Sequence, residues 1–83
     1  MNKRVIVLFS NDGYEALYID GKFEDSGNGL GEGDALLYML KKSEEFNFKH
    51  SDVAIHSLTP EDNRRVEDYG DFLDNLNDYT YGY

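Results

Sequence analysis

Apolar runs separated by polar turns dominate the first part of the chain. Val5 to Phe9 is a continuous run of β-favouring residues that ends at Ser10-Asn11-Asp12-Gly13, a pattern typical of a buried strand and a turn. A second run spans Tyr14 to Ile19, and the pair Asp20-Gly21 separates it from Lys22-Phe23-Glu24. A two-residue Asp-Gly link favours a type I′ hairpin turn, because both of its residues take positive φ. These residues therefore predict a three-stranded meander.

A helix is predicted from Asp34 onward. The run from Ala35 to Glu45 consists largely of strong helix formers, with an acid at its start and lysines later, as the helix dipole favours. We expect one apolar face of this helix to cover the sheet. The residues expected on that face are Leu36, Leu37, Met39 and Leu40.

A fourth strand and a second helix complete the pattern. Alternation from Asp52 to Leu58 predicts the strand. Thr59-Pro60-Glu61-Asp62 supplies a capping hydroxyl, a proline at the first helical position and an acid three residues after the cap, which together predict a helix start. Gly70 favours a break into two short helices. The expected inward stripe is Val66, Tyr69, Leu73 and Leu76.

The elements follow the order βββαβα. We predict an α+β fold in which a small, three- to four-stranded, largely antiparallel sheet is covered by two helices. The 83 residues form a single domain, 1–83. Within it we expect a flexible Gly-rich loop at 25–33, with four of the eight glycines, and an aromatic tail at 78–83.

Acidic charge narrows the classes of partner. The chain has 17 Asp and Glu against 8 Lys and Arg, a net charge of −9, and residues 61–83 alone carry −5. Direct binding to nucleic acid or to an anionic membrane is therefore disfavoured, which leaves a basic protein as partner or a role of the charge in solubility alone. No apolar run reaches the length of a signal-peptide core or a membrane span, and there is no cysteine. We expect a cytoplasmic protein.

No motif for catalysis, metal or cofactor emerges. The glycines at 27, 29, 31 and 33 match neither the dinucleotide nor the Walker pattern, and a loop starting at Asp25 lacks the EF-hand ligands. His50 and His56 do not have the spacing of a zinc pair on one helix. The sequence thus predicts that the chain is not an enzyme and has no cofactor. A small ligand-binding or enzymatic domain is a further hypothesis, which would require a concave pocket with convergent polar groups.

The strongest candidate contact surface lies near the carboxy terminus. If the second helix continues through residue 78, four acids share its outer face at steps of 4, 3 and 4: Glu67, Asp71, Asp74 and Asp78. Such a row has a spacing of the same order as that of backbone phosphates, although it is sparser. Tyr79 and Tyr81 would serve as secondary anchors, and Gly27–Gly33 as an adaptable flank. An ordinary solvated helix surface is the alternative.

Taken together, these features predict an acidic protein-binding module, an inhibitor or adaptor that docks on a basic surface of a nucleic-acid-handling protein. In bulk properties, though in no shared motif, such a protein is similar to phage-encoded anti-defence proteins such as anti-CRISPRs and DNA mimics. The alternative is a self-associating structural module, in which an exposed sheet edge and the aromatic tail make a homodimer.

Overall fold

The fold is one sheet with helices on both faces. The computed structural model describes residues 3–83, and the side chains of all of them except residues 32 and 33. The strands are β1 (Val5–Phe9), β2 (Glu15–Ile19), β3 (Lys22–Gly27) and β4 (Val53–Ser57); the α-helices are α1 (Ala35–Phe46) and α2 (Pro60–Tyr69); and the short 3₁₀ helices are η1 (Leu30–Gly33), η2 (His50–Asp52) and η3 (Leu76–Asp78). The predicted α+β class and element order are confirmed.

The sheet is mixed, with the strand order β3-β2-β1-β4. β2 is antiparallel to both β1 and β3, as the meander predicts, and Asp20 and Gly21 at the β2–β3 turn have φ values of 51° and 88°. β4 instead pairs with β1 in parallel, with Val53 opposite Val5. The sheet is therefore less antiparallel than expected, because the chain crosses over through α1 and enters β4 in the direction of β1.

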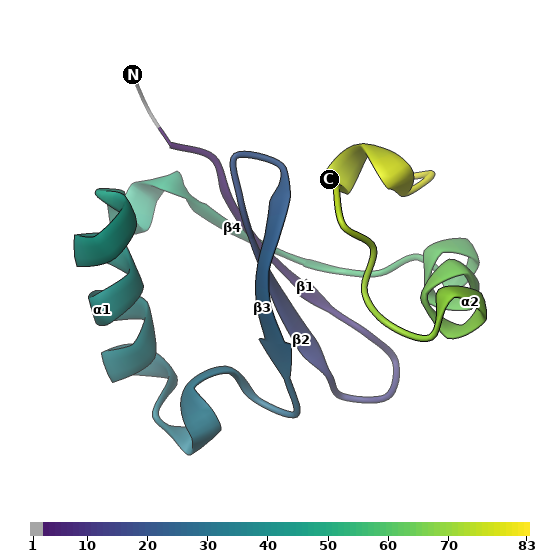
Figure 1. The fold of residues 1–83 in the computed structure, drawn as a ribbon, viewed down its shortest axis with the longest axis horizontal. Helices are drawn as coiled ribbons and strands as arrows, with labels where there is room; N and C mark the ends of the chain where they lie inside the picture. Colours follow the sequence, from purple (N-terminus) through teal and green to yellow (C-terminus); the bar gives the residue numbers. More distant parts are fainter. Residues whose placement is uncertain (1–2) are drawn as a thin grey trace.

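Alternate residues of the central strands feed two separate hydrophobic clusters. α1 lies on one side of the sheet, and α2 with the carboxy-terminal segment lies on the other (Figure 1). Val5 and Val7 point to the α1 side, whereas Ile6 and Leu8 point to the α2 side. This continuous apolar run is explained by burial on both faces of the sheet.

The prediction that the three leucines of α1 cover the sheet is wrong. Leu36 is 75% exposed and Leu40 is 54% exposed, and Leu37 is also exposed. The residues of α1 that pack against the sheet-side cluster are Tyr38, Met39 and Phe46. Tyr38 also donates a hydrogen bond from its hydroxyl to Asp25 Oδ2 at 2.8 Å, and Lys42 Nζ lies over the Tyr38 and Phe46 rings. The helix is therefore rotated away from the face that its leucines suggest.

Helix α2 begins and ends where local signals place it. Thr59 is the N-cap and its hydroxyl accepts a hydrogen bond from Asp62 N, while Gly70, in the left-handed region at φ 87°, ends the helix after Tyr69. The inward stripe is only partly correct. Leu73 and Leu76 are buried, but Tyr69 is exposed, because the chain turns at Gly70 and the helical spacing ends there.

The carboxy-terminal segment folds back over α2 and the sheet. Asp62, fully buried at 0% exposure, accepts hydrogen bonds from Thr80 N and Oγ1 at 2.8 Å each, from Tyr81 N at 3.1 Å and from the Tyr83 hydroxyl at 2.8 Å. Tyr79 and Tyr83 are buried as a result. Two of the three tyrosines in the predicted aromatic tail 78–83 are thus part of the core, while Tyr81 is exposed. We call the set of contacts to Asp62 the Asp62 clasp.

The predicted Gly-rich loop 25–33 also contains regular structure. β3 extends to Gly27, and η1 occupies Leu30–Gly33. Gly31 has a φ of 75°, and a Cβ added there would lie 2.5 Å from Tyr38 Cβ, so glycine allows η1 to approach α1 closely. Neither this segment nor any other in the described part of the chain forms a helix long and apolar enough to cross a membrane.

Candidate functional site

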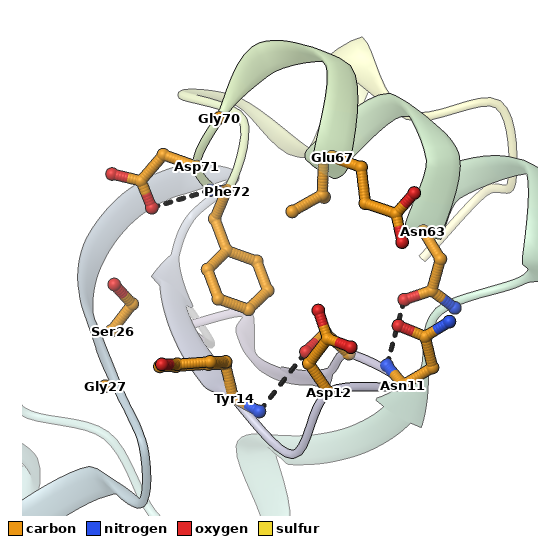
Figure 2. Close-up of a pocket in the computed structure, with 12 residues that line it drawn as sticks. Asn11, Asp12, Tyr14, Ser26, Gly27, Asn63, Glu67, Gly70, Asp71 and Phe72 are labelled. Atoms are coloured by element: carbon orange, nitrogen blue, oxygen red, sulfur yellow. Dashed lines mark hydrogen bonds between the residues drawn. The ribbon is translucent and has the colours of Figure 1, made fainter.

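A hollow of about 420 Å³ lies between the β1–β2 turn, the end of β3 and helix α2 (Figure 2). Three acids line it, Asp12 from the turn, Glu67 from α2 and Asp71 just beyond α2. We call it the acidic hollow. The remaining lining residues are Ser10, Asn11, Tyr14, Ser26, Gly27, Asn63, Val66, Gly70 and Phe72.

Hydrogen bonds hold the β1–β2 turn against α2. Asn11 N donates to Asn63 Oδ1 at 3.0 Å, and Asn63 Nδ2 donates to the carbonyl oxygens of Leu58 and Thr59 at 3.1 and 3.2 Å. Within the turn, Ser10 Oγ accepts a hydrogen bond from Tyr14 N at 3.2 Å. The turn is therefore fixed, with Asp12 and Glu67 on facing sides of the hollow (Figure 2).

Aromatic side chains supply part of the wall. The Phe72 ring points toward Tyr14 (Figure 2), but it is only 5% exposed and belongs to the core, whereas Tyr14 is exposed. Asp71 Oδ1 accepts a hydrogen bond from Phe72 N at 2.8 Å, which keeps this carboxylate at the rim. The site thus combines carboxylates with ring surfaces.

The charge of the hollow is uncompensated by the residues around it. None of its lining residues is Lys, Arg or His, and within residues 3–83 its three carboxylates form no ion pair. The described side chains also contain no group of three His, Cys, Asp or Glu placed to hold a metal ion. Such a site can accept a cationic side chain, which carboxylates attract and aromatic rings accommodate.

The predicted row of four acids on one helix is wrong. Because α2 ends at Tyr69, only Glu67 of the four lies on α2, and the structure brings Asp71 to the same hollow through the turn at Gly70. Asp74 lies instead beside β3, where its carbonyl oxygen accepts a hydrogen bond from Phe23 N at 2.9 Å, and Asp78 belongs to η3. Asp12 was not predicted as a site residue, since the sequence indicates only that it lies in a turn and not that this turn faces α2.

The two predicted tyrosine anchors differ in access. Tyr79 is 6% exposed, and its hydroxyl accepts a hydrogen bond from Leu73 N at 3.1 Å and lies 2.6 Å from the Tyr18 hydroxyl. The prediction that Tyr79 is a contact residue is therefore wrong, because its side chain is buried. Tyr81 is exposed and packs on the Tyr83 ring, so its role as an anchor stays a prediction. Of the flank Gly27–Gly33, Gly27 lines the hollow.

Two buried tyrosines of the core, Tyr18 and Tyr79, have raised pKa values. Burial, followed by the hydrogen bond with Tyr79, raises the pKa of Tyr18 far above its ordinary value. Burial also raises the pKa of Tyr79. Both hydroxyls therefore stay protonated, and they serve as fixed hydrogen-bonding groups beneath the carboxy-terminal segment.

The chain matches no protein-family model, no curated protein and no solved structure.

Proposed function

We propose that this chain is a protein-binding module that docks through its acidic hollow on a basic surface of another protein. The observation that carries the proposal is the hollow itself, where Asp12, Glu67 and Asp71 stand around Phe72 with no base among the lining residues. A partner's arginine or lysine is the group that this arrangement favours.

An arginine side chain suits both parts of the site. Its guanidinium is planar and presents several donors, so it can bond to a carboxylate on either side of the hollow, Asp12 or Glu67, while stacking on the exposed ring of Tyr14. A cation placed over an aromatic ring gains about 0.5–2 kcal/mol, with the larger values where water is excluded. The net charge of −9 adds attraction at longer range and speeds the encounter with a basic surface.

The class of partner follows from the same charge. Dense basic surfaces are typical of proteins that bind nucleic-acid backbones, because their Lys and Arg side chains neutralise phosphates and release the counterions condensed on the nucleic acid, which supplies much of the affinity. A small acidic module seated on such a surface competes with the nucleic acid. We therefore propose that this chain acts as an inhibitor or adaptor of a nucleic-acid-handling protein, in the manner of anti-CRISPRs and DNA mimics.

A defined probe tests whether the hollow accepts arginine. Two peptides are titrated into the isotopically labelled protein and followed by NMR, one with a central arginine and the other with citrulline, which has the same shape but no charge. We expect the arginine peptide alone to shift the amide signals of Asp12, Glu67 and Phe72. Equal shifts with both peptides, or shifts elsewhere only, would contradict the proposed mode of binding.

Capture from the native host's lysate tests the partner class. The wild type is compared with Asp12→Asn/Glu67→Gln, and with the matched control Glu44→Gln/Glu45→Gln on α1, which removes the same charge from the other side of the sheet. We expect a nucleic-acid-binding protein to be recovered by the wild type and the control at ~0.1 M salt, and to be lost at ~1 M, where the Debye length falls from ~10 to ~3 Å. Equal loss with both double variants would place the binding in overall charge and not in the hollow.

A further inference from the structure

The two edges of the sheet differ in their protection. β3 carries the charged residues Lys22, Glu24 and Asp25, has an irregular register with β2, and exchanges backbone hydrogen bonds with the carboxy-terminal segment near Asp74. β4, Val53–Ser57, has no Lys, Arg, Asp, Glu or proline and keeps one register with β1 along its whole length. Charges, prolines and bulges are the usual means of blocking edge pairing, and β4 uses none of them.

The backbone of β4 is oriented to accept a further strand. Leu58 N donates to Phe9 O on β1 at 2.8 Å. Backbone groups alternate in direction along a strand, so the N–H and C=O groups of Val53, Ile55 and Ser57 point away from β1. Residues 3–83 place no strand on that side of β4.

An apolar groove adjoins this open edge. It has a volume of about 490 Å³ and lies between α1 and β4, with Val7, Phe9 and Phe48 among its lining residues. On its borders, Leu36 from α1 and Ile55 from β4 are exposed by 75% and 65%. An exposed apolar patch beside an unprotected edge indicates a contact surface.

The charge around the groove separates its occupant from the basic partner proposed above. Residues 34–58, which include α1 and β4, hold four acids and three bases, a net charge of −1, whereas the rest of the chain carries −8. The one acid that lines the groove, Glu15, has its carboxylate bonded to Leu30 N at 2.8 Å. This surface offers little to attract a basic protein and little to repel another copy of an acidic chain.

We infer that β4 pairs with β4 of a second copy of this chain, antiparallel about a two-fold axis at Ile55, with the two sheets joined and the apolar grooves covered. The five-residue strand alone is short for a stable interface, which requires roughly 800 Å² from each copy. The exposed leucines of α1 supply the additional apolar area. Because this surface lies away from the acidic hollow, the inference stands independently of the proposed function.

Sedimentation and light scattering of the full chain from micromolar to millimolar concentration test the pairing. We expect a monomer–dimer equilibrium that persists at ~1 M salt, since screening acts on charges and the groove is apolar. Ile55→Lys places like charges opposite each other at the axis and should raise the dissociation constant about tenfold or more. Tyr69→Lys on α2 is the matched control, because Tyr69 is also an exposed apolar residue, and it should leave the equilibrium unchanged.

Amide hydrogen exchange identifies the surface directly. In the dimer the amides of Val53, Ile55 and Ser57 should become protected as the concentration rises, and in Ile55→Lys this protection should be lost. A chain that stays monomeric at millimolar concentration would overturn the inference. A dimer that survives Ile55→Lys, or that dissociates equally with Tyr69→Lys, would overturn it as well.

Discussion

We expect the Asp62 clasp to hold the carboxy-terminal segment in place, and a single substitution tests this. Asp62 is fully buried in α2, and its carboxylate accepts hydrogen bonds from Thr80, Tyr81 and Tyr83, as well as one from Thr59 Oγ1 at 3.2 Å. The perturbation is Asp62→Ala. It removes the acceptor and leaves the donors in place.

The expected loss follows from the burial of each donor. The Tyr83 hydroxyl is buried, and an unsatisfied buried donor costs about 1–3 kcal/mol. Thr80 and Tyr81 are exposed, so water can replace part of their bonds, and each costs at the low end of about 0.5–1.5 kcal/mol. Together these contributions give a loss of about 3 kcal/mol. A chain of 83 residues has a free energy of unfolding of roughly 4–12 kcal/mol, so this loss is a large share of it.

Urea unfolding followed by circular dichroism measures the difference. Asp68→Ala removes an exposed acid from the same helix and should change the free energy of unfolding by no more than about 0.5 kcal/mol. Asp62→Asn keeps one acceptor oxygen and should fall between the two. A loss for Asp62→Ala no larger than that for Asp68→Ala would refute the reasoning.

The same carboxylate gives the clasp a pH dependence. Burial alone would raise the pKa of Asp62, but the hydrogen bonds from Thr80, Tyr83 and Tyr81 outweigh it and hold this pKa below its ordinary value of 3.8. A lowered pKa means that the stabilisation is complete above pH 3.8 and is lost as the pH falls through the lowered value. The stability difference between wild type and Asp62→Asn should therefore be constant near neutrality and shrink below pH 3.8. A difference that grows on acidification would contradict this sign.

Further predictions concern the tyrosine pair and the glycines before α1. Tyr18→Phe should lower the free energy of unfolding by about 1–3 kcal/mol, because the Tyr18 hydroxyl donates to Leu73 O at 2.5 Å in the core. In a double-mutant cycle with Tyr79→Phe, measured by urea unfolding, the two losses should be non-additive by about 0.5 kcal/mol or more. Gly31→Ala should destabilise more than Gly29→Ala in the same assay. Both residues have positive φ, but only at Gly31 would the new Cβ meet Tyr38.

Local signals in the sequence predict most of the elements. The Asp20-Gly21 turn and the Thr59 cap each depend on residues within four positions of one another, so the pattern alone is sufficient to place them. Gly70 is also a local signal, because it marks the end of α2. The predicted row of acids required a helix through residue 78 and so conflicted with this signal. Helix α2 ends at Gly70, because glycine adopts the left-handed cap with little strain.

Contacts between distant residues explain what the sequence did not predict. The burial of Tyr83 depends on Asp62, 21 positions earlier, and no local pattern marks such a pair. Asp12 and Glu67 line the same hollow, where Asn11 bonds to Asn63 across the fold. The predicted burial of the leucines of α1 was wrong for another reason. Helical periodicity shows which residues share a face, but it does not show whether that face packs against the sheet.

Charge and exposure place two different kinds of surface on this small chain. The acidic hollow depends on electrostatic attraction, whereas the β4 edge is nearly neutral and apolar, so salt should weaken contacts at the first and spare those at the second. A dimer joined at β4 would present two hollows at once. Binding to a partner with repeated cationic sites would then be bivalent, and its avidity would exceed the affinity of one hollow without any new contact. Ile55→Lys should in that case weaken binding to such a partner while leaving the arginine peptide's affinity for the hollow unchanged.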